Sequence, residues 1–314
     1  MPIFSNTSDR LSALNNFGTD PGSLSADTYI PKNFPKNGPL VVVLHGSTQS
    51  PESYDIGSGW STLADECGIA LLFPGQRLAN NLIGSFNWFD TGDNQRGGGE
   101  PLSIRQMIKQ VVDDHEVDPS RVFITGMSSG GAMTSVMLAT YPEVFAGGAI
   151  IAGLPYGTAD NMMEAIIRMH GFGSPSDSQL DTLVRGASEF SGPWPTISVW
   201  HGDVDETVDN ANAGSIVGQW KKIHKVEGPP TRVETVDGFP REVWCDTDGR
   251  VVIEQYSIAD MGHGTPISAE GDKGLGEAGE YMLEVGISST RHIADFWCLT
   301  QSGAANRAEP KTAA

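Results

Sequence analysis

Ser128 stands between two glycines in the segment 122–132, which reads VFITGMSSGGA. The apolar and β-branched residues before it predict a strand over 122–125, and the small residues after it predict a helix over 129–140. Glycines two positions before and after the serine remove side chains where such a strand and helix approach each other. The pattern is typical of a sharp turn that exposes a nucleophilic hydroxyl, with a helix N-terminus beneath it that favours an anion.

A serine hydroxyl becomes a good nucleophile only when a base removes its proton, and a carboxylate orients that base. Seven histidines are available, and His263 lies between two glycines in a loop after a β-rich run, so we interpret it as the base. For the acid, the segment VWHGDVDETV offers Asp205, which lies far enough past a strand to turn back toward His263. Asp203 is the alternative acid, and we interpret His201 as a packing or hydrogen-bonding residue.

Such a nucleophile also needs donors for the oxyanion that its attack creates. One donor is expected to be the backbone N–H of Ser129, the residue after the nucleophile. The other is expected from the loop after an early strand, where VVVLHGSTQS offers the N–H of Ser47 or of Thr48.

The elements that position these groups alternate along the chain. Unbroken apolar runs closed by glycine, proline or a His-Gly pair predict strands covered on both faces, at 40–44, 69–73, 122–125, 149–152 and 196–200. Helical patterns at 102–115, 129–140 and 211–224 lie between them. This order predicts an α/β fold with a mostly parallel, doubly wound sheet, whose strand ends carry the site.

Two segments depart from the alternation. Residues 155–195 hold a helical patch at 162–169 and a Gly/Pro/Ser stretch, which we interpret as a lid-like helical insertion. Two β-rich runs around DTDG, within 231–257, predict a hairpin. We expect one domain over 1–301 and a flexible tail over 302–314.

Charge and composition limit the classes of partner that the protein can have. The formal net charge of −19 argues against nucleic acids and anionic membranes, and favours neutral substrates. No apolar run approaches the length of a membrane span, and the first residues lack a signal-peptide pattern, so a soluble cytoplasmic protein is expected. The three cysteines have no metal-binding spacing, so no metal is expected, and Cys245–Cys298 is the disulfide pair to test.

Two apolar side chains are candidates for the walls of a substrate pocket. Trp88, in the loop sequence FNWFD, either lines an acyl or aromatic pocket or packs its loop onto the sheet. Leu154, just past the strand at 149–152, is the second candidate.

Several long blocks in order resemble the PHB depolymerase family of esterases, which is similar to the feruloyl and acetylxylan esterases among the α/β-hydrolases. They include LHGSTQSPESYDIGSGW, RVFITGMSSGGAMTSVMLATYPEVFAGGAIIAGLPYG, GPWPTISVWHGDVDETV and MGHGTPI, and the match runs from about residue 40 to 299. The resemblance implies an α/β-hydrolase fold and hydrolysis of carboxylic esters with no cofactor. It also implies Ser128 as nucleophile, His263 as base and Asp205 as acid.

The sequence departs from the family at two points. Family members often carry cysteines where this chain has Ser47 and Ser85, which implies an absent disulfide and suits a reducing compartment. We also expect no linker and polymer-binding domain of the kind that secreted polyester depolymerases carry, since the sequence leaves no room for them. Soluble oligomers or small esters are therefore expected as substrates in preference to crystalline polymer.

These observations predict a serine carboxylic ester hydrolase that acts through an acyl-enzyme on short-chain or aromatic esters, such as feruloyl or acetyl esters, or on hydroxyalkanoate oligomers. The alternatives are a depolymerase of poly(3-hydroxybutyrate) or another polyester, and a serine peptidase of the same fold. A non-catalytic carbohydrate- or polymer-binding protein is a different class. The intact Ser, His and Asp argue against it, because a binder needs none of the three.

Overall fold

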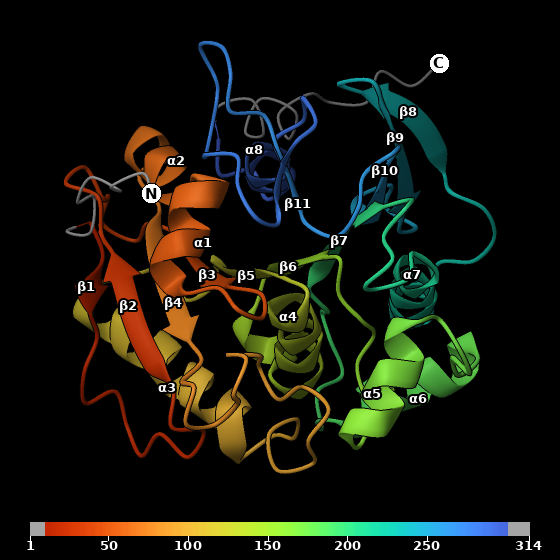
Figure 1. Ribbon diagram of the computed structural model, residues 1–314, viewed down its shortest axis with the longest axis horizontal. Helices are drawn as coiled ribbons and strands as arrows, with labels where there is room; N and C mark the ends of the chain where they lie inside the picture. Colours follow the sequence, from red (N-terminus) through yellow and green to blue (C-terminus); the bar gives the residue numbers. More distant parts are fainter. Residues whose placement is uncertain (1–9, 301–314) are drawn as a thin grey trace.

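The computed structural model describes residues 10–300, which form a ten-stranded sheet with helices on both faces (Figure 1). The strands of this sheet are β1 (Ser12–Ala13), β2 (Ser25–Tyr29), β3 (Leu40–Leu44), β4 (Ala70–Gly75), β5 (Val122–Met127), β6 (Gly147–Ile151), β7 (Thr196–Gly202), β8 (Arg232–Val236), β9 (Phe239–Cys245) and β10 (Val251–Ile258). A separate parallel pair is formed by β11 (Thr265–Ile267) and β12 (Met282–Glu284). The helices are α1 (Pro51–Ser58), α2 (Trp60–Cys67), α3 (Gly99–Asp114), α4 (Ser129–Thr140), α5 (Met162–Met169), α6 (Asp177–Gly186), α7 (Ala211–His224) and α8 (Ser289–Phe296), with a short 3-10 helix at Pro142–Val144.

The strand order in the sheet is β1-β2-β4-β3-β5-β6-β7-β10-β9-β8. The six strands from β4 to β10 pair in parallel, and the strands at both edges are antiparallel. Every residue of β3, β4, β5 and β6 is buried, as expected for parallel strands covered on both faces. The mostly parallel, doubly wound sheet expected from the sequence is therefore confirmed.

Two apolar cores lie on the opposite faces of the sheet. One core takes its helical side chains from α3 to α7, including Met107, Val136 and Ile216. The other takes them from α1, α2 and α8, including Trp60 and Ile293. In Figure 1, α1, α2 and α8 lie above the sheet, and α3 to α7 lie below it. Because six parallel strands share these cores, the loops at their carboxyl ends meet along one edge of the sheet.

The helices α5 and α6 make up the expected insertion. They lie beside α7 in Figure 1, and Leu180 and Val184 of α6 are fully buried. Gln219 of α7 holds the insertion at its amide, which accepts the N–H of Tyr156 and donates to the carbonyls of Tyr156 and Leu180, each at 3.1 Å. The insertion is thus packed on one face of the sheet, and its role as a lid stays a prediction.

Several sequence expectations can be compared directly with the structure. The helices over 129–140, 162–169 and 211–224 form with those bounds, and β9 and β10 form the hairpin around DTDG. The three cysteines are free, so the candidate Cys245–Cys298 disulfide is not formed. The expected flexible tail at 302–314 lies outside the described residues.

Candidate active site

The chain turns sharply from β5 into α4 at Ser128. This residue has φ 55° and ψ −118°, a backbone conformation that residues other than glycine rarely adopt. A Cβ at Gly126 would lie 2.4 Å from the carbonyl oxygen of Gly130, and a Cβ at Gly130 would lie 2.5 Å from the carbonyl oxygens of Leu44 and His45. Glycine is therefore required on both sides of Ser128, because the strand, the helix and β3 approach within backbone contact.

Three side chains from separate strand ends meet at this turn. The Nε2 atom of His263 lies 2.9 Å from Ser128 Oγ, and its Nδ1 lies 2.7 Å from Asp205 Oδ2. Since the carboxylate only accepts, Nδ1 carries the proton, and Nε2 is free to accept the proton of the Ser128 hydroxyl. The structure thus brings together the three residues that the sequence singled out as nucleophile, base and acid.

The carboxylate of Asp205 is fully occupied by donors. Its Oδ1 accepts the backbone N–H groups of Thr207 and Val208, both at 2.9 Å. Its Oδ2 accepts His263 and also lies 3.3 Å from His201 Nε2. Burial opposes the charged form, but the hydrogen bonds from His201 and His263 hold the pKa of Asp205 well below its usual range. The Asp205 carboxylate is therefore charged at neutral pH.

Asp203, the alternative acid, lies elsewhere in the same loop. Its Oδ1 accepts the backbone N–H of Asp260 at 2.7 Å and so links the loop after β7 to the loop after β10. Among the described residues, it is Asp205 that accepts the hydrogen bond from His263 Nδ1.

The loop after β3 supplies one candidate oxyanion donor. The N–H of Thr48 donates to the carbonyl of Ile83 at 2.7 Å, and the N–H of Gly46 donates to Gln49 Oε1 at 2.9 Å. Within the described part of the chain this leaves the N–H of Ser47 without an acceptor. The Ser47 hydroxyl lies 3.3 Å from that of Ser129, whose own N–H is one of the unpaired donors in the first turn of α4. Two free N–H groups therefore flank Ser128.

A buried polar network holds this loop. Both nitrogens of His45 are used, because Nδ1 donates to the Gly46 carbonyl at 2.8 Å and Nε2 accepts the Gln76 N–H at 3.1 Å. The Gln76 side chain in turn donates to Glu100, which also accepts the Asn87 N–H at 3.0 Å. Burial, assisted by the nearby charge of Asp93, raises the pKa of Glu100 to about 8. Gln76 and Glu100 were not expected at the site, although Gln76 directly follows a parallel strand at the edge of the sheet where sites form.

The two candidate pocket residues are both core residues. Trp88 is 7% exposed and packs edge-on against Phe89, with ring centroids 5.5 Å apart. Leu154 is 2% exposed and belongs to the same apolar core. Of the two alternatives for Trp88, the structure shows the second, in which the side chain packs the FNWFD loop onto the body of the protein. A substrate-facing role for either residue stays a prediction.

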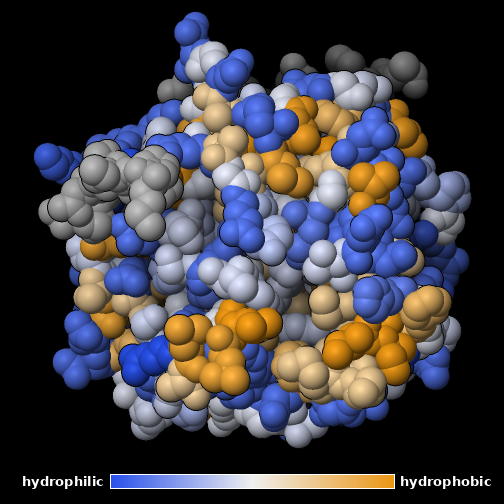
Figure 2. All heavy atoms as spheres, viewed as in Figure 1, coloured by the Kyte–Doolittle hydropathy of each residue, from blue (hydrophilic) through white to orange (hydrophobic). Residues whose placement is uncertain are grey.

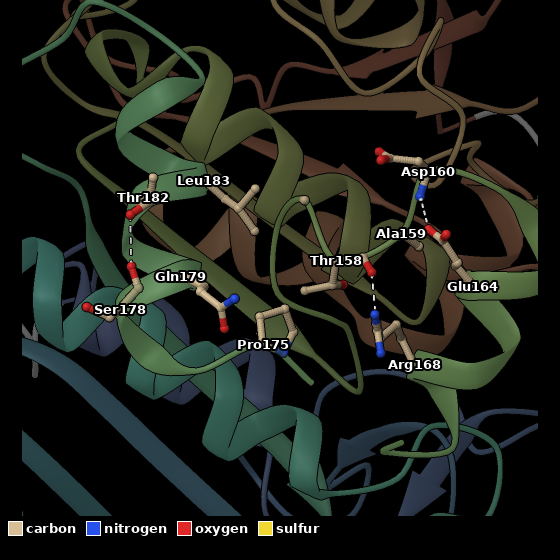
Figure 3. A pocket seen from close by; sticks show the side chains of 11 residues that line it. Thr158, Ala159, Asp160, Glu164, Arg168, Pro175, Ser178, Gln179, Thr182 and Leu183 are labelled. Carbon is tan, nitrogen blue, oxygen red and sulfur yellow. Dashed lines mark hydrogen bonds between the residues drawn. The ribbon is translucent and has the colours of Figure 1, made fainter. Parts of the chain in front are cut away.

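A cavity of about 630 Å³ lies within the insertion, and neither Trp88 nor Leu154 lines it (Figure 3). Its lining includes Thr158, Glu164, Arg168 and Gln179. Ser128, Asp205 and His263 are not among the lining residues. Arg168 donates to the Thr158 carbonyl at 2.9 Å, so the guanidinium holds the insertion's own backbone.

Two further observations concern residues 10–300 alone. Their histidine, cysteine and acidic side chains form no group of three or more that could hold a metal ion. None of their helices is both long and apolar enough to cross a membrane.

The fold and the site together define a class of protein. A serine turn after a central parallel strand, with an acid and a histidine following in that order on later strand ends, is the arrangement of the α/β-hydrolases. A comparison with solved structures agrees. An acetyl xylan esterase from Aspergillus awamori superimposes with a TM-score of 0.78 over 92% of this chain and 99% of its own, at 22% identity. A poly(3-hydroxybutyrate) depolymerase from Bordetella parapertussis gives 0.51 over 81% of this chain and 85% of its own, at 15% identity.

Sequence comparisons identify the family. The model of the family described as Esterase PHB depolymerase matches residues 24–228. Poly(3-hydroxyalkanoate) depolymerase C of Paucimonas lemoignei is 43% identical over 91% of this chain and 70% of its own length. An acetylxylan esterase of Coprinopsis cinerea is 30% identical over 82% of this chain and 70% of its own, and feruloyl esterase B of Talaromyces funiculosus is 30% identical over 82% and 73%. The chain belongs to the PHB depolymerase family of esterases and is a carboxylic ester hydrolase.

Proposed function

We propose that Ser128 is the nucleophile of a two-step ester hydrolysis, with His263 as general base and Asp205 as the orienting acid. The observation that carries the proposal is the chain of two hydrogen bonds that joins Ser128 Oγ to His263 and His263 to Asp205, at 2.9 and 2.7 Å. Asp205 fixes the imidazole in the tautomer whose Nε2 accepts a proton, and it stabilises the imidazolium that forms.

In the first step, Ser128 Oγ attacks the ester carbonyl while its proton passes to His263 Nε2. The carbonyl oxygen becomes an oxyanion and accepts the N–H groups of Ser47 and Ser129. Collapse of this intermediate breaks the bond to the alcohol, which leaves with the proton from His263. In the second step His263 takes a proton from water as the water oxygen attacks the acyl carbonyl, and the bond to Ser128 Oγ then breaks. The carboxylic acid is released and the proton passes from His263 back to Ser128 Oγ.

The substrates that we propose are neutral short-chain or aromatic esters and hydroxyalkanoate oligomers. The net charge of −19 disfavours anionic substrates, and the relatives named above are esterases of acetylated xylan and ferulate and a polyhydroxyalkanoate depolymerase. Trp88 and Leu154 are proposed to close the inner end of the acyl site from the core side.

The experiment compares wild type with Ser128→Ala on p-nitrophenyl acetate and butyrate. Wild-type turnover should exceed that of the variant by about 10³-fold or more. Equal rates would overturn the proposal. A panel of methyl ferulate, acetylxylan, a 3-hydroxybutyrate trimer and an aromatic diester then ranks the substrate classes.

A second candidate function is hydrolysis of a solid polyester, and one surface feature favours it. The outer face of α5 exposes Met162, Met163, Ile166 and Ile167, and Phe172 follows in the next loop. Figure 2 shows apolar surface (orange) over the part of the molecule where α5 lies in Figure 1. Exposed apolar clusters of this kind are typical of contact surfaces, and a neutral polyester is a chemically matched partner.

We also propose that the protein acts in the cytoplasm. The free thiols of Cys67, Cys245 and Cys298, together with serines at positions 47 and 85, suit a reducing compartment. Fractionation of cells of the source organism tests this, and activity recovered only outside the cell would contradict it.

A further inference from the structure

His201 lies at the carboxyl end of β7, four residues before Asp205, and its side chain is 3% exposed. Its Nε2 lies 2.8 Å from the carbonyl oxygen of Val208 and 3.3 Å from Asp205 Oδ2. Both neighbours are acceptors, so the ring proton is on Nε2 and is shared between them.

The other ring nitrogen supports the same assignment. Among the residues that the structure describes, His201 Nδ1 is buried and has no hydrogen-bond partner. A second proton there would bury an N–H without an acceptor, which costs free energy, so the ring is a neutral donor. His201 therefore adds no charge beside Asp205 and acts only through its hydrogen bond.

Val208 connects the two side chains. Its N–H donates to Asp205 Oδ1 at 2.9 Å, while its carbonyl accepts His201. The carboxylate is thus held by two backbone donors on Oδ1 and by two imidazoles on Oδ2. Removal of His201 would leave His263 as the remaining side-chain donor to Oδ2, and the carboxylate group would be held less firmly in its orientation.

We infer that His201 is a positioning residue, which shares one proton between Val208 and Asp205 and thereby sets the orientation and charge distribution of the carboxylate that holds His263. This inference rests on the proposed roles of Asp205 and His263. A donor to a carboxylate draws negative charge away from its other partner, so His201 weakens the stabilisation of protonated His263. In the described part of the chain, Asp203 and Glu206 lie in the same loop as Asp205, and the ring of Tyr281 stands edge-on to His263 with centroids 5.9 Å apart.

The test measures kcat, KM and the pH of half-maximal kcat/KM for p-nitrophenyl butyrate. His201→Phe keeps the ring volume but removes the donor. We expect kcat to fall about tenfold with KM within about twofold, and the acidic half-maximum to move up by about half a pH unit. His201→Gln places an amide N–H near the position of Nε2, and it should restore most of kcat and return the half-maximum toward the wild-type value.

His224→Phe is the matched control. His224 is a half-buried histidine whose Nε2 donates to a carbonyl, that of Pro195, at 3.0 Å, and it lies at the opposite end of the strands from Ser128. His224→Phe should lower the melting temperature without moving the pH of half-maximal kcat/KM. A purely structural role for His201 predicts that both His201 variants behave like this control, and that outcome would overturn the inference.

Two further comparisons keep the result decisive. If His201→Phe does not fold, His201→Asn replaces it, because its shorter amide falls short of Asp205; kcat equal to that of His201→Gln would then reject the inference. Ser128→Ala is assayed in parallel, and full turnover by that variant would reject the proposed mechanism instead.

Discussion

His45 donates its Nδ1–H to the carbonyl oxygen of Gly46 across 2.8 Å. A trans peptide directs its C=O and N–H in opposite directions, so the bond that fixes the Gly46 carbonyl also fixes the direction of the Ser47 N–H. Burial lowers the pKa of His45 to about 4, and the ring therefore stays neutral over the pH range in which the enzyme is assayed. His45 thus holds one of the two proposed oxyanion donors in place.

Replacement of His45 by Phe should lower kcat by about tenfold to a hundredfold with a smaller change in KM, because the donor acts on charge that develops in the transition state. His45→Asn should retain more activity, since its amide nitrogen lies near the position of Nδ1. Steady-state kinetics on p-nitrophenyl butyrate distinguish the two. Equal losses in both variants would contradict a role for the Nδ1 donor.

The two acids of the loop after β7 provide an isosteric comparison. Asp205→Asn should lower kcat by about 10³- to 10⁴-fold, because an amide cannot hold His263 in the required tautomer or stabilise its charged form. Asp203→Asn keeps an oxygen that accepts the Asp260 N–H, and its kcat should stay within a few fold of wild type. The ratio of the two kcat values is the measurement. A larger loss at Asp203 would reverse the assignment of the acid.

Much of the central sheet could be predicted from the sequence because its signals are local. The run at 40–44 is wholly apolar, and α4 begins directly after the glycine-flanked turn at Ser128, so these elements form with the expected bounds. The helices α1 and α2 were not expected, because they are one short segment of mixed polarity divided by Gly59, which adopts φ 74°. Their stability comes from burial of Tyr54 and Trp60 in a core that local pattern does not reveal.

The same distinction applies to the site. The proximity of Ser128, Asp205 and His263 could be predicted because each lies just past a parallel strand, where the fold gathers polar groups. The contact between His201 and Asp205 could not be predicted, because it depends on a loop that turns back over the end of β7. The network through Gln76 and Glu100 depends on packing between segments 24 residues apart.

Glu100 should make the stability of the fold depend on pH. An unfolded glutamate ionises near pH 4.5, but burial raises the folded pKa of Glu100 to about 8. The stabilisation from its neutral form is therefore complete below pH 4.5 and is lost as pH rises through 8. The free energy of unfolding of Glu100→Gln, relative to wild type, should rise by roughly 3–5 kcal/mol between pH 4.5 and 8.5. Urea melts at several pH values measure it, and a constant difference would contradict the shifted pKa.

Gly130→Ala tests the turn at Ser128, and Gly214→Ala in α7 is its control. Gly130→Ala places a Cβ 2.5 Å from two backbone carbonyl oxygens, so it should lower the free energy of unfolding by several kcal/mol and abolish activity. Gly214 lies in α7 with open space around its Cβ position, and alanine there should stabilise the fold by about 0.5–1 kcal/mol. Thermal melts and kcat of both variants provide the check. Normal activity in Gly130→Ala would mean that the turn tolerates a wider separation of strand and helix.

The exposed face of α5 distinguishes soluble from solid substrates. A double variant, Met163→Glu with Phe172→Glu, adds two charges to this face, at side chains that are 67% and 69% exposed. If solid polyester is a substrate that docks here, release of soluble product from an amorphous polyester suspension should fall about fivefold or more, because charged side chains resist burial against a polymer. Cleavage of p-nitrophenyl butyrate should stay within twofold, since a small soluble ester needs no adsorption. The control is Val233→Glu on β8, an edge strand of the sheet, where the valine is 61% exposed. Equal losses in the control and the double variant would assign the effect to net charge, and no loss in either would exclude α5 as the contact surface.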